Sequence, residues 1–193
     1  MNRLQKLRDE MSAFFAELYV GEEKRLVFGE GNERANVVMI GEAPGEQEAL
    51  QGRPFVGKAG KNLDEFLELS GMDRRALYIT NTVKIRPTKI SQAGRVVNRP
   101  PKPEEIKLFA PWLLRELRMI APGIIVTLGN VSLKALLGND KTIGECHGKW
   151  YEWEMARVYP LYHPASVIYN PSLKEVYRAD VIRLGEEVRK KRD

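Results

Sequence analysis

The chain has 193 residues, of which 43% are hydrophobic and 30% charged, and its formal net charge is +5. This length suffices for one domain with a substantial core, and no apolar run is long enough to cross a membrane. Because the first residues are polar and lack the apolar stretch of a signal peptide, we expect a cytoplasmic protein without a membrane partner. The single cysteine, Cys146, excludes an intramolecular disulfide and a cluster held by several cysteines of one chain.

Four apolar runs predict the core strands of a sheet, at residues 36–40, 77–80, 124–128 and 157–162, the last as the second arm of a hairpin from Trp150. Apolar residues at helical spacing predict helices at residues 2–19, 59–69, 104–119, 131–137 and 173–191. Strands that alternate with helices favour an α/β fold whose mostly parallel sheet is covered on both faces.

The loop after the first strand carries a mixture of groups typical of a binding site. Its glycines allow backbone N–H groups to approach a ligand, while Glu42, Arg53 and Phe55 supply a carboxylate, a cation and a ring. A simple turn is the alternative. A nucleotide phosphate loop is disfavoured because Ala59 stands where that motif needs a hydroxyl to bind magnesium.

The other predicted strands also end at polar or glycine residues, namely Asn81, Gly129-Asn130 and His163. Parallel strands place these ends at one edge of the sheet, so we expect a common pocket there. A capping role for Asn81 and a structural His-Pro turn are the local alternatives. Residues 85–103, with four prolines, predict a long loop, and no acidic residue precedes Glu104 in this basic stretch.

Several segments resemble the uracil-DNA glycosylase superfamily, and most closely its family 4, the thermostable archaeal and bacterial branch. These are GEAPG (41–45), GRPFVGKAG (52–60), YITNTVK (78–84), GKWYEW (148–153) and HPA (163–165). The resemblance implies a three-layer α/β/α sandwich with a central, mostly parallel four-stranded sheet. It also implies a DNA repair enzyme that flips uracil out of the duplex and hydrolyses its N-glycosidic bond.

The resemblance assigns roles to the strand-end residues. Phe55 stacks on the flipped base, and Asn81 reads its Watson–Crick edge, with Ala43 and Gly45 of the first loop beside it. His163 donates a hydrogen bond to uracil O2 and stabilises the negative charge of the departing base. Glu42 is the candidate that positions the attacking water; Glu48 is a weaker one, and Glu46 and Glu48 are alternatively surface charges.

The resemblance also implies DNA contacts. Val167 and Ile168 are the expected apolar wedge that fills the gap left by the base, with core packing as the rival explanation. Ser166, Lys84, Arg86 and the basic loop are expected to hold phosphates.

Family 4 enzymes typically bind a 4Fe–4S cluster through four cysteines, and here the corresponding places carry Phe14, Glu17, Ile85 and Phe109. We therefore expect no cofactor and no metal, apolar packing at the cluster's place, and residues 1–24 as a helix where the cluster-binding segment stood. Without a histidine in residues 85–103, covalent capture of uracil DNA is not expected. His147 is interpreted as a surface or turn residue.

Together, these features predict one domain over residues 1–193: a monomeric, monofunctional uracil-DNA glycosylase of a prokaryotic cytoplasm, associated with the nucleoid. Its partner would be DNA containing uracil or another deaminated base. Two alternatives stay open. One is a glycosylase for hypoxanthine or xanthine, and the other is a catalytically weak protein that binds damaged DNA.

Overall fold

The computed structural model describes residues 3–190; residues 2 and 191, the outer ends of two predicted helices, lie outside the described part. Its strands are β1 (Glu30–Gly31), β2 (Val37–Gly41), β3 (Tyr78–Asn81), β4 (Thr88–Ile90), β5 (Val96–Asn98), β6 (Ile124–Leu128), β7 (Tyr151–Trp153) and β8 (Ala156–Leu161). Its α-helices are α1 (Arg3–Leu18), α2 (Glu46–Gln51), α3 (Lys58–Ser70), α4 (Pro103–Ile120), α5 (Asn130–Leu137), α6 (Ile143–Cys146), α7 (Pro164–Tyr169) and α8 (Lys174–Lys190).

The main sheet has the strand order β1-β3-β2-β6-β8-β7. Its four central strands, β3, β2, β6 and β8, run parallel and are the four predicted from the sequence. Antiparallel β1 and β7 extend the two edges. The predicted α/β fold with a mostly parallel four-stranded centre is therefore confirmed. The two-residue strand β1 was not predicted, because it is too short to show an alternating pattern.

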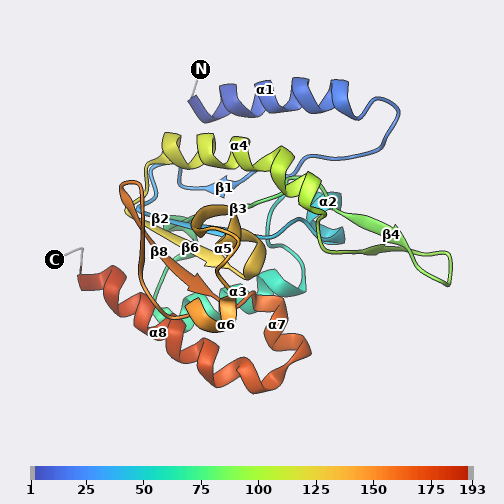
Figure 1. Ribbon diagram of the computed structural model, residues 1–193. Helices are drawn as coiled ribbons and strands as arrows, with labels where there is room; N and C mark the ends of the chain where they lie inside the picture. Colours follow the sequence, from blue (N-terminus) through green and yellow to red (C-terminus); the bar gives the residue numbers. More distant parts are fainter. Residues whose placement is uncertain (1–2, 191–193) are drawn as a thin grey trace.

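Helices cover both faces of this sheet (Figure 1). Alternate residues of β2 point to opposite sides: Val37 and Met39 pack with α3, α7 and α8, whereas Val38 and Ile40 pack with α1 and α4. Strands buried on both faces read as continuous apolar runs, which explains why these four were visible in the sequence. None of the helices in residues 3–190 is long and apolar enough to span a membrane.

Helix α1 is attached to the body through α4. The rings of Phe15 and Phe109 stack with centroids 4.3 Å apart and planes within 7°, and Ile85 and Met11 pack around them. Two of the residues at the expected cluster places, Ile85 and Phe109, are thus fully buried in an apolar cluster. Phe14 lies half-exposed at its edge and Glu17 is exposed, so the apolar packing is formed by Phe15 in place of Phe14.

The predicted long loop of residues 85–103 contains a β-hairpin. Strands β4 and β5 form a separate two-stranded antiparallel sheet, which projects from the body in Figure 1. The expectation of an irregular loop was wrong in this respect. The strands were missed because each has three residues and is exposed, so neither shows the alternation of buried and exposed residues that marks a strand.

Candidate functional site

The ends of β2 and β3 meet at a residue pair that brings two predicted site residues together. Gly41 is the register partner of Asn81. A Cβ atom on Gly41 would lie 2.4 Å from Asn81 Oδ1 and 2.5 Å from Phe55 Cζ. Only glycine therefore leaves room for the carboxamide and the ring to pack against the end of β2.

The Phe55 ring is held by a constrained backbone. Phe55 has φ +53°, a left-handed conformation that is costly for a residue with a side chain. A Cβ on Gly60 would lie 2.0 Å from the Phe55 carbonyl oxygen, so α3 begins in direct contact with this loop. Arg74 donates hydrogen bonds to the carbonyls of Pro54 (3.2 Å) and Phe55 (3.1 Å). Together, these contacts hold the Phe55 ring in one position.

His163 follows β8 and caps the N-terminus of α7. Its Nδ1 accepts a hydrogen bond of 3.1 Å from the backbone N–H of Ala165, so in the neutral imidazole the proton is on Nε2. Burial lowers the pKa of His163 to about 4, against a smaller opposing effect of the Glu48 carboxylate. The ring stacks on Phe55, with centroids 5.9 Å apart. At neutral pH, His163 is an uncharged N–H donor.

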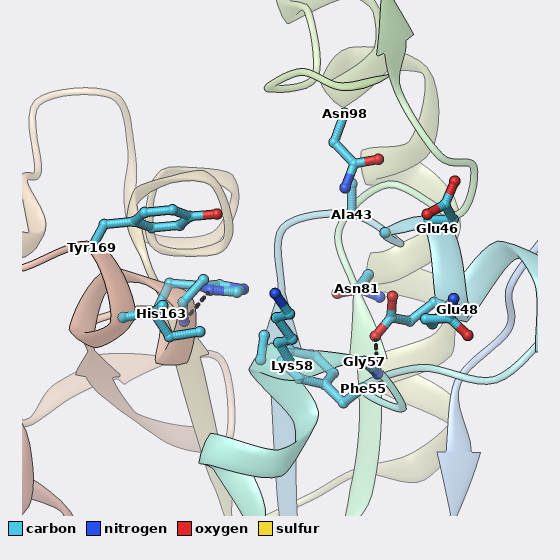
Figure 2. A pocket seen from close by; sticks show the side chains of 15 residues that line it. Ala43, Glu46, Glu48, Phe55, Gly57, Lys58, Asn81, Asn98, His163 and Tyr169 are labelled. Atoms are coloured by element: carbon cyan, nitrogen blue, oxygen red, sulfur yellow. Dashed lines mark hydrogen bonds between the residues drawn. The ribbon is translucent and has the colours of Figure 1, made fainter. Parts of the chain in front are cut away.

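These residues line one cavity of about 520 Å³ (Figure 2). Of the predicted site residues, the cavity wall includes Ala43, Gly45, Phe55, Asn81, His163 and Ile168. The end of the third predicted strand, Gly129-Asn130, is not part of the wall. Asn130 Oδ1 instead accepts a hydrogen bond from the N–H of Ile143. Within residues 3–190, no hydrogen bond to the Asn81 carboxamide is found, although this residue is buried. Its donor and acceptor are available to a ligand.

Glu48 is a buried residue of the cavity wall, so its interpretation as a surface charge was wrong. Its Oε1 accepts hydrogen bonds from the backbone N–H groups of Gly57 (2.8 Å) and Val56 (3.1 Å), at the start of α3. These bonds allow a carboxylate to remain buried. Glu46, by contrast, is exposed, and its carboxylate pairs with Arg86.

Glu42 is half-buried next to Ala43 but does not belong to the cavity wall. Burial raises the pKa of its carboxyl group, because the charged form loses hydration. The geometry thus places Glu48 on the cavity and Glu42 behind it. The assignment of Glu42 to the attacking water stays a prediction.

Several further wall residues were given no role from the sequence, among them Lys58, Asn98 and Tyr169. Lys58 extends toward the middle of the cavity in Figure 2, with Tyr169 and Asn98 on either side of it. Lys58 lies within the GRPFVGKAG segment (52–60) and Tyr169 directly follows Ile168, which was the available signal. Asn98 had no such signal, because it reaches the cavity through the hairpin.

The structure places the two residues of the expected wedge differently, and a wedge role for Ile168 stays a prediction. Val167 is 9% exposed and packs in the core between the sheet and α8, so it cannot enter DNA without leaving that core. Ile168 is 43% exposed and lines the cavity, and Tyr169 beside it is also exposed. Helical geometry explains the difference, because successive residues of α7 point in different directions.

Lys84 was expected to hold a phosphate, and this was wrong. Its side chain is 0% exposed. Its ammonium group donates to Glu116 Oε2 (2.6 Å), Thr80 Oγ1 (2.5 Å) and the carbonyl oxygen of Asn81 (2.8 Å). Basic residues next to a proline-rich loop are usually solvated, but this one turns inward to a carboxylate on α4.

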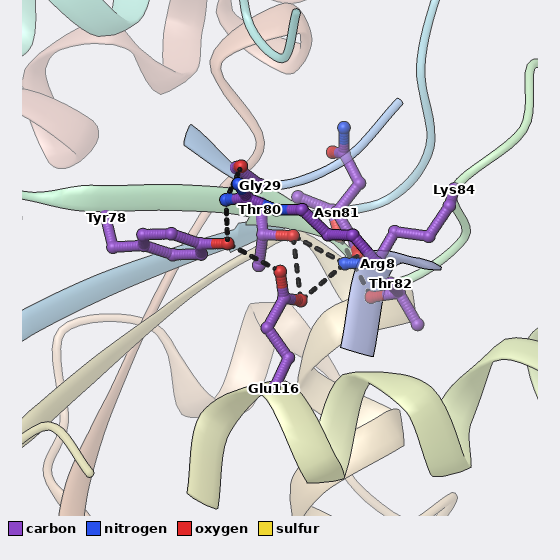
Figure 3. A network of polar contacts seen from close by, with 9 residues as sticks. Arg8, Gly29, Tyr78, Thr80, Asn81, Thr82, Lys84 and Glu116 are labelled. Carbon is purple, nitrogen blue, oxygen red and sulfur yellow. Dashed lines mark hydrogen bonds and ion pairs between the residues drawn. The ribbon is translucent and has the colours of Figure 1, made fainter. Parts of the chain in front are cut away.

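Figure 3 shows the network to which Lys84 belongs. The Tyr78 hydroxyl donates to Glu116 Oε1 (2.8 Å), and Arg8 of α1 reaches the same hydroxyl (3.4 Å) and the carbonyl of Gly29 (3.1 Å). Burial and the Glu116 carboxylate raise the pKa of Tyr78, so the phenol stays a donor. The network connects α1, α4 and the end of β3, directly behind Asn81.

The two remaining predicted DNA contacts lie outside the cavity wall. Arg86 is half-buried and donates from Nε to Asn98 Oδ1 (2.7 Å). It therefore supports the cavity wall through Asn98. Ser166 lies half-buried in α7, three residues after His163.

The residues at the family's cluster positions do not fit an iron–sulfur cluster. Phe14, Ile85 and Phe109 offer no donor atom, and Glu17 is the only oxygen ligand among the four. Cys146 is buried elsewhere, in a cluster with Leu133 and Ile143. Across residues 3–190, no group of three or more His, Cys, Asp or Glu side chains is arranged to hold a metal ion. His147 is half-buried, and its Nδ1 pairs with the buried carboxylate of Asp180 on α8 (2.6 Å).

Comparison with known proteins identifies relatives along most of the chain. The family described as "Uracil DNA glycosylase superfamily" matches residues 28–183. A type-4 uracil-DNA glycosylase of Archaeoglobus fulgidus is 42% identical, over 84% of this chain and 82% of the relative. One from Saccharolobus solfataricus is 40% identical over 87% and 78%. The crystal structure of SMUG2 from Pedobacter heparinus, at 14% identity, shares the fold, with a TM-score of 0.59 over 96% of this chain and 85% of that one.

The buried ion pair between Lys84 and Glu116 leads us to expect a large effect of its removal on stability. Lys84→Met leaves the Glu116 carboxylate buried without its counter-ion, so we expect the free energy of unfolding to fall by about 3–5 kcal/mol. Adding Glu116→Leu removes the stranded charge, and the double variant is expected to recover most of the loss. Urea unfolding of both variants measures this. A double variant as unstable as Lys84→Met would contradict the assignment of the pair.

Proposed function

The chain belongs to the uracil DNA glycosylase superfamily, and on this basis we propose that it hydrolyses the N-glycosidic bond of uracil in DNA and leaves an abasic site. The observation that carries the proposal is the cavity in which the unpaired Asn81 carboxamide and the Nε2–H of His163 share a wall with the Phe55 ring. A base stacked in a duplex cannot reach such a recessed wall, so the proposal includes flipping of the nucleotide.

Recognition of uracil is proposed to rest on Asn81 and Phe55. The Asn81 amide can donate to uracil O4 and accept from N3–H, whereas cytosine presents the opposite pattern at both atoms. Phe55 offers its ring to the face of the base. Because Gly41 and Gly60 fix both side chains, little conformational entropy is lost when the base binds. Ala43 and Gly45 border the same space.

Cleavage is proposed to depend on charge developing on the base. As the glycosidic bond breaks, electrons move onto the pyrimidine ring and its O2 becomes an anion. A preorganised neutral donor such as His163 Nε2–H stabilises this anion more strongly than the ground-state carbonyl. The lowered pKa of His163 keeps the imidazole uncharged, and its stacking on Phe55 directs the ring.

The attacking water needs a carboxylate that positions it against the sugar. We propose Glu42 for this role, because its raised pKa reflects a carboxyl group that no described cation neutralises. Glu48 is the rival, since it lines the cavity. Its Oε1 is, however, already occupied by two backbone N–H groups.

We further propose that residues 1–193 act as one domain without an iron–sulfur cluster. Support comes from the Phe15–Phe109 stack and the Arg8–Tyr78 contact, which attach α1 to the same body. Protein purified without oxygen is expected to contain far less than one iron atom per chain and to be colourless. Stoichiometric iron and sulfide would contradict this proposal.

The function is tested on matched oligonucleotides that contain uracil, hypoxanthine, xanthine or thymine. We expect excision of uracil alone, with strand scission only after alkali, as for a monofunctional enzyme. His163→Ala is expected to slow single-turnover cleavage about 100- to 1000-fold with binding retained, because one charge-stabilising donor is lost. Asn81→Ala is expected to lose both rate and base discrimination.

Asn139→Ala, in an exposed turn, is the matched control and should keep the parent rate. Excision of hypoxanthine or xanthine but not uracil would assign a different deaminated base. Tight binding of uracil DNA without any excision would indicate a damage-binding protein.

The pH dependence of the excision rate distinguishes Glu42 from Glu48 as the residue that positions the water. A water-positioning carboxylate acts only when it is deprotonated, so activity is present above its pKa and is lost as the pH falls through it. This loss of activity forms the acidic limb of the pH–rate profile. If Glu42 causes it, the limb should lie above the ordinary glutamate pKa of 4.5, because burial raises the pKa of Glu42. His163 cannot cause the limb, since it remains neutral down to about pH 4.

Single-turnover rates between pH 4.5 and 8, a range chosen as roughly that of carboxyl titration, measure the limb. Glu42→Gln should lower the rate about 100-fold and abolish the limb. Glu65→Gln, an exposed carboxylate of α3 outside the cavity wall, is the control. If Glu48→Gln abolished the limb and Glu42→Gln did not, the roles would be exchanged.

A further inference from the structure

The hairpin of β4 and β5 has no obvious structural purpose. In the described residues its two strands pair only with each other, and it projects from the body (Figure 1). Asn98 of β5 lines the cavity. An isolated two-stranded ribbon is marginally stable in water. The chain nevertheless holds this ribbon in place, which suggests that its position matters.

The attachment lies at the base of the ribbon. Arg99 donates from Nε to the Thr88 carbonyl (3.0 Å), and its guanidinium forms a two-pronged pair with Glu105 of α4 (2.6 and 2.7 Å). Arg86 holds Asn98 from the other side (2.7 Å). The base is therefore fixed to the body, and the outer part of the hairpin extends into solvent.

One face of the ribbon continues the cavity wall outward. The register pairs Thr88 with Asn98 and Ile90 with Val96, and residues two apart along a strand lie on the same face. Asn98 lines the cavity. Ile90 and Val96, the next pair outward, are 67% and 53% exposed. An apolar pair thus stands in solvent directly beyond the cavity mouth.

The ribbon is also strongly basic. Residues 85–103 contain Arg86, Lys89, Arg95, Arg99 and Lys102 and no aspartate or glutamate. Arg86 and Arg99 are occupied by the attachment, whereas no carboxylate of the described chain pairs with Lys89 or Arg95. Both side chains are exposed on the outer part of the ribbon. Because successive strand residues point to opposite faces, Lys89 lies on the face opposite Ile90 and Val96. A groove of DNA, which surrounds an inserted ribbon with phosphates, sugars and base edges, matches cations and apolar groups on different sides of the ribbon.

We propose that this ribbon is an arm that lies along duplex DNA beside the damaged nucleotide. Lys89 and Arg95 contact phosphates, and Ile90 and Val96 press on the sugar and base edges of the groove. A two-stranded ribbon has the width to enter a groove, and apolar side chains are typical of groove contacts that deform DNA. The position beside the lesion rests on the proposed function, but contact with the duplex does not.

Binding to an undamaged duplex tests the arm without requiring excision. Each cation that neutralises a phosphate contributes about 0.9 to the slope of log affinity against log salt. Lys89→Ser/Arg95→Ser should therefore reduce the slope by about 1.8. Between about 50 and 200 mM salt, the parent would lose about twelve-fold more affinity than the variant. Arg3→Ser/Lys6→Ser, an equal loss of exposed charge on α1, should leave the slope unchanged.

The apolar pair is tested separately. Ile90→Ser/Val96→Ser should weaken duplex binding roughly ten-fold with the salt slope unchanged, because it removes apolar area and no charge. Single-stranded DNA, which has no groove, should be affected less than about two-fold. Met155→Ser, an exposed apolar change in the turn between β7 and β8, is the control.

Two results would contradict the proposal that the ribbon contacts duplex DNA. One is an unchanged slope and affinity in both ribbon variants. The other is a parent dimer that Ile90→Ser/Val96→Ser converts to a monomer with DNA affinity unchanged, which would make the face an interface between copies. A parent protein that binds duplex through the arm but excises no uracil would instead refute the proposed function alone.

Discussion

The close approach of three residues at the ends of β2 and β3 is the constraint on which the site depends. Parallel pairing sets Gly41 opposite Asn81, and the missing side chain of Gly41 admits both the Asn81 carboxamide and the Phe55 ring. Neither group could occupy its place if any other residue stood at position 41. The cavity wall is therefore specified by backbone geometry first, and its side chains are oriented before any ligand binds.

Behind that wall, polar groups are buried in a way that keeps them paired. The Lys84 ammonium holds the Asn81 carbonyl and pairs with Glu116, which in turn receives the Tyr78 hydroxyl. A buried ion pair adds little net stability, but each partner becomes costly to leave alone. Such a network favours one arrangement of α1, α4 and β3 over alternatives, and Asn81 lies at its end.

In and around the cavity, the electrostatics disfavour charge on His163 and on the half-buried Glu42. Burial lowers the pKa of His163 and raises that of Glu42, so both shifts oppose charge. The buried Glu48 carboxylate is stabilised by hydrogen bonds from backbone N–H groups at the start of α3. This preorganised environment suits a reaction in which charge appears only in the transition state. The proposed contacts with the surrounding DNA are exposed groups at the rim, Ile168 and the β4–β5 ribbon.

The sequence alone determined the four central strands, the ends at which site residues stand, and the family resemblance, because buried parallel strands are continuous apolar runs and motifs follow them directly. It did not determine which way a given side chain turns. Lys84 and Glu48 looked like surface charges, and Val167 like a wedge, yet all three point inward. Their surroundings come from α4, α3 and α8, elements distant in sequence. Asn98 reaches the cavity only because an exposed hairpin folds back beside it. The direction in which these side chains turn depends on tertiary packing, which the local spacing of residues does not encode.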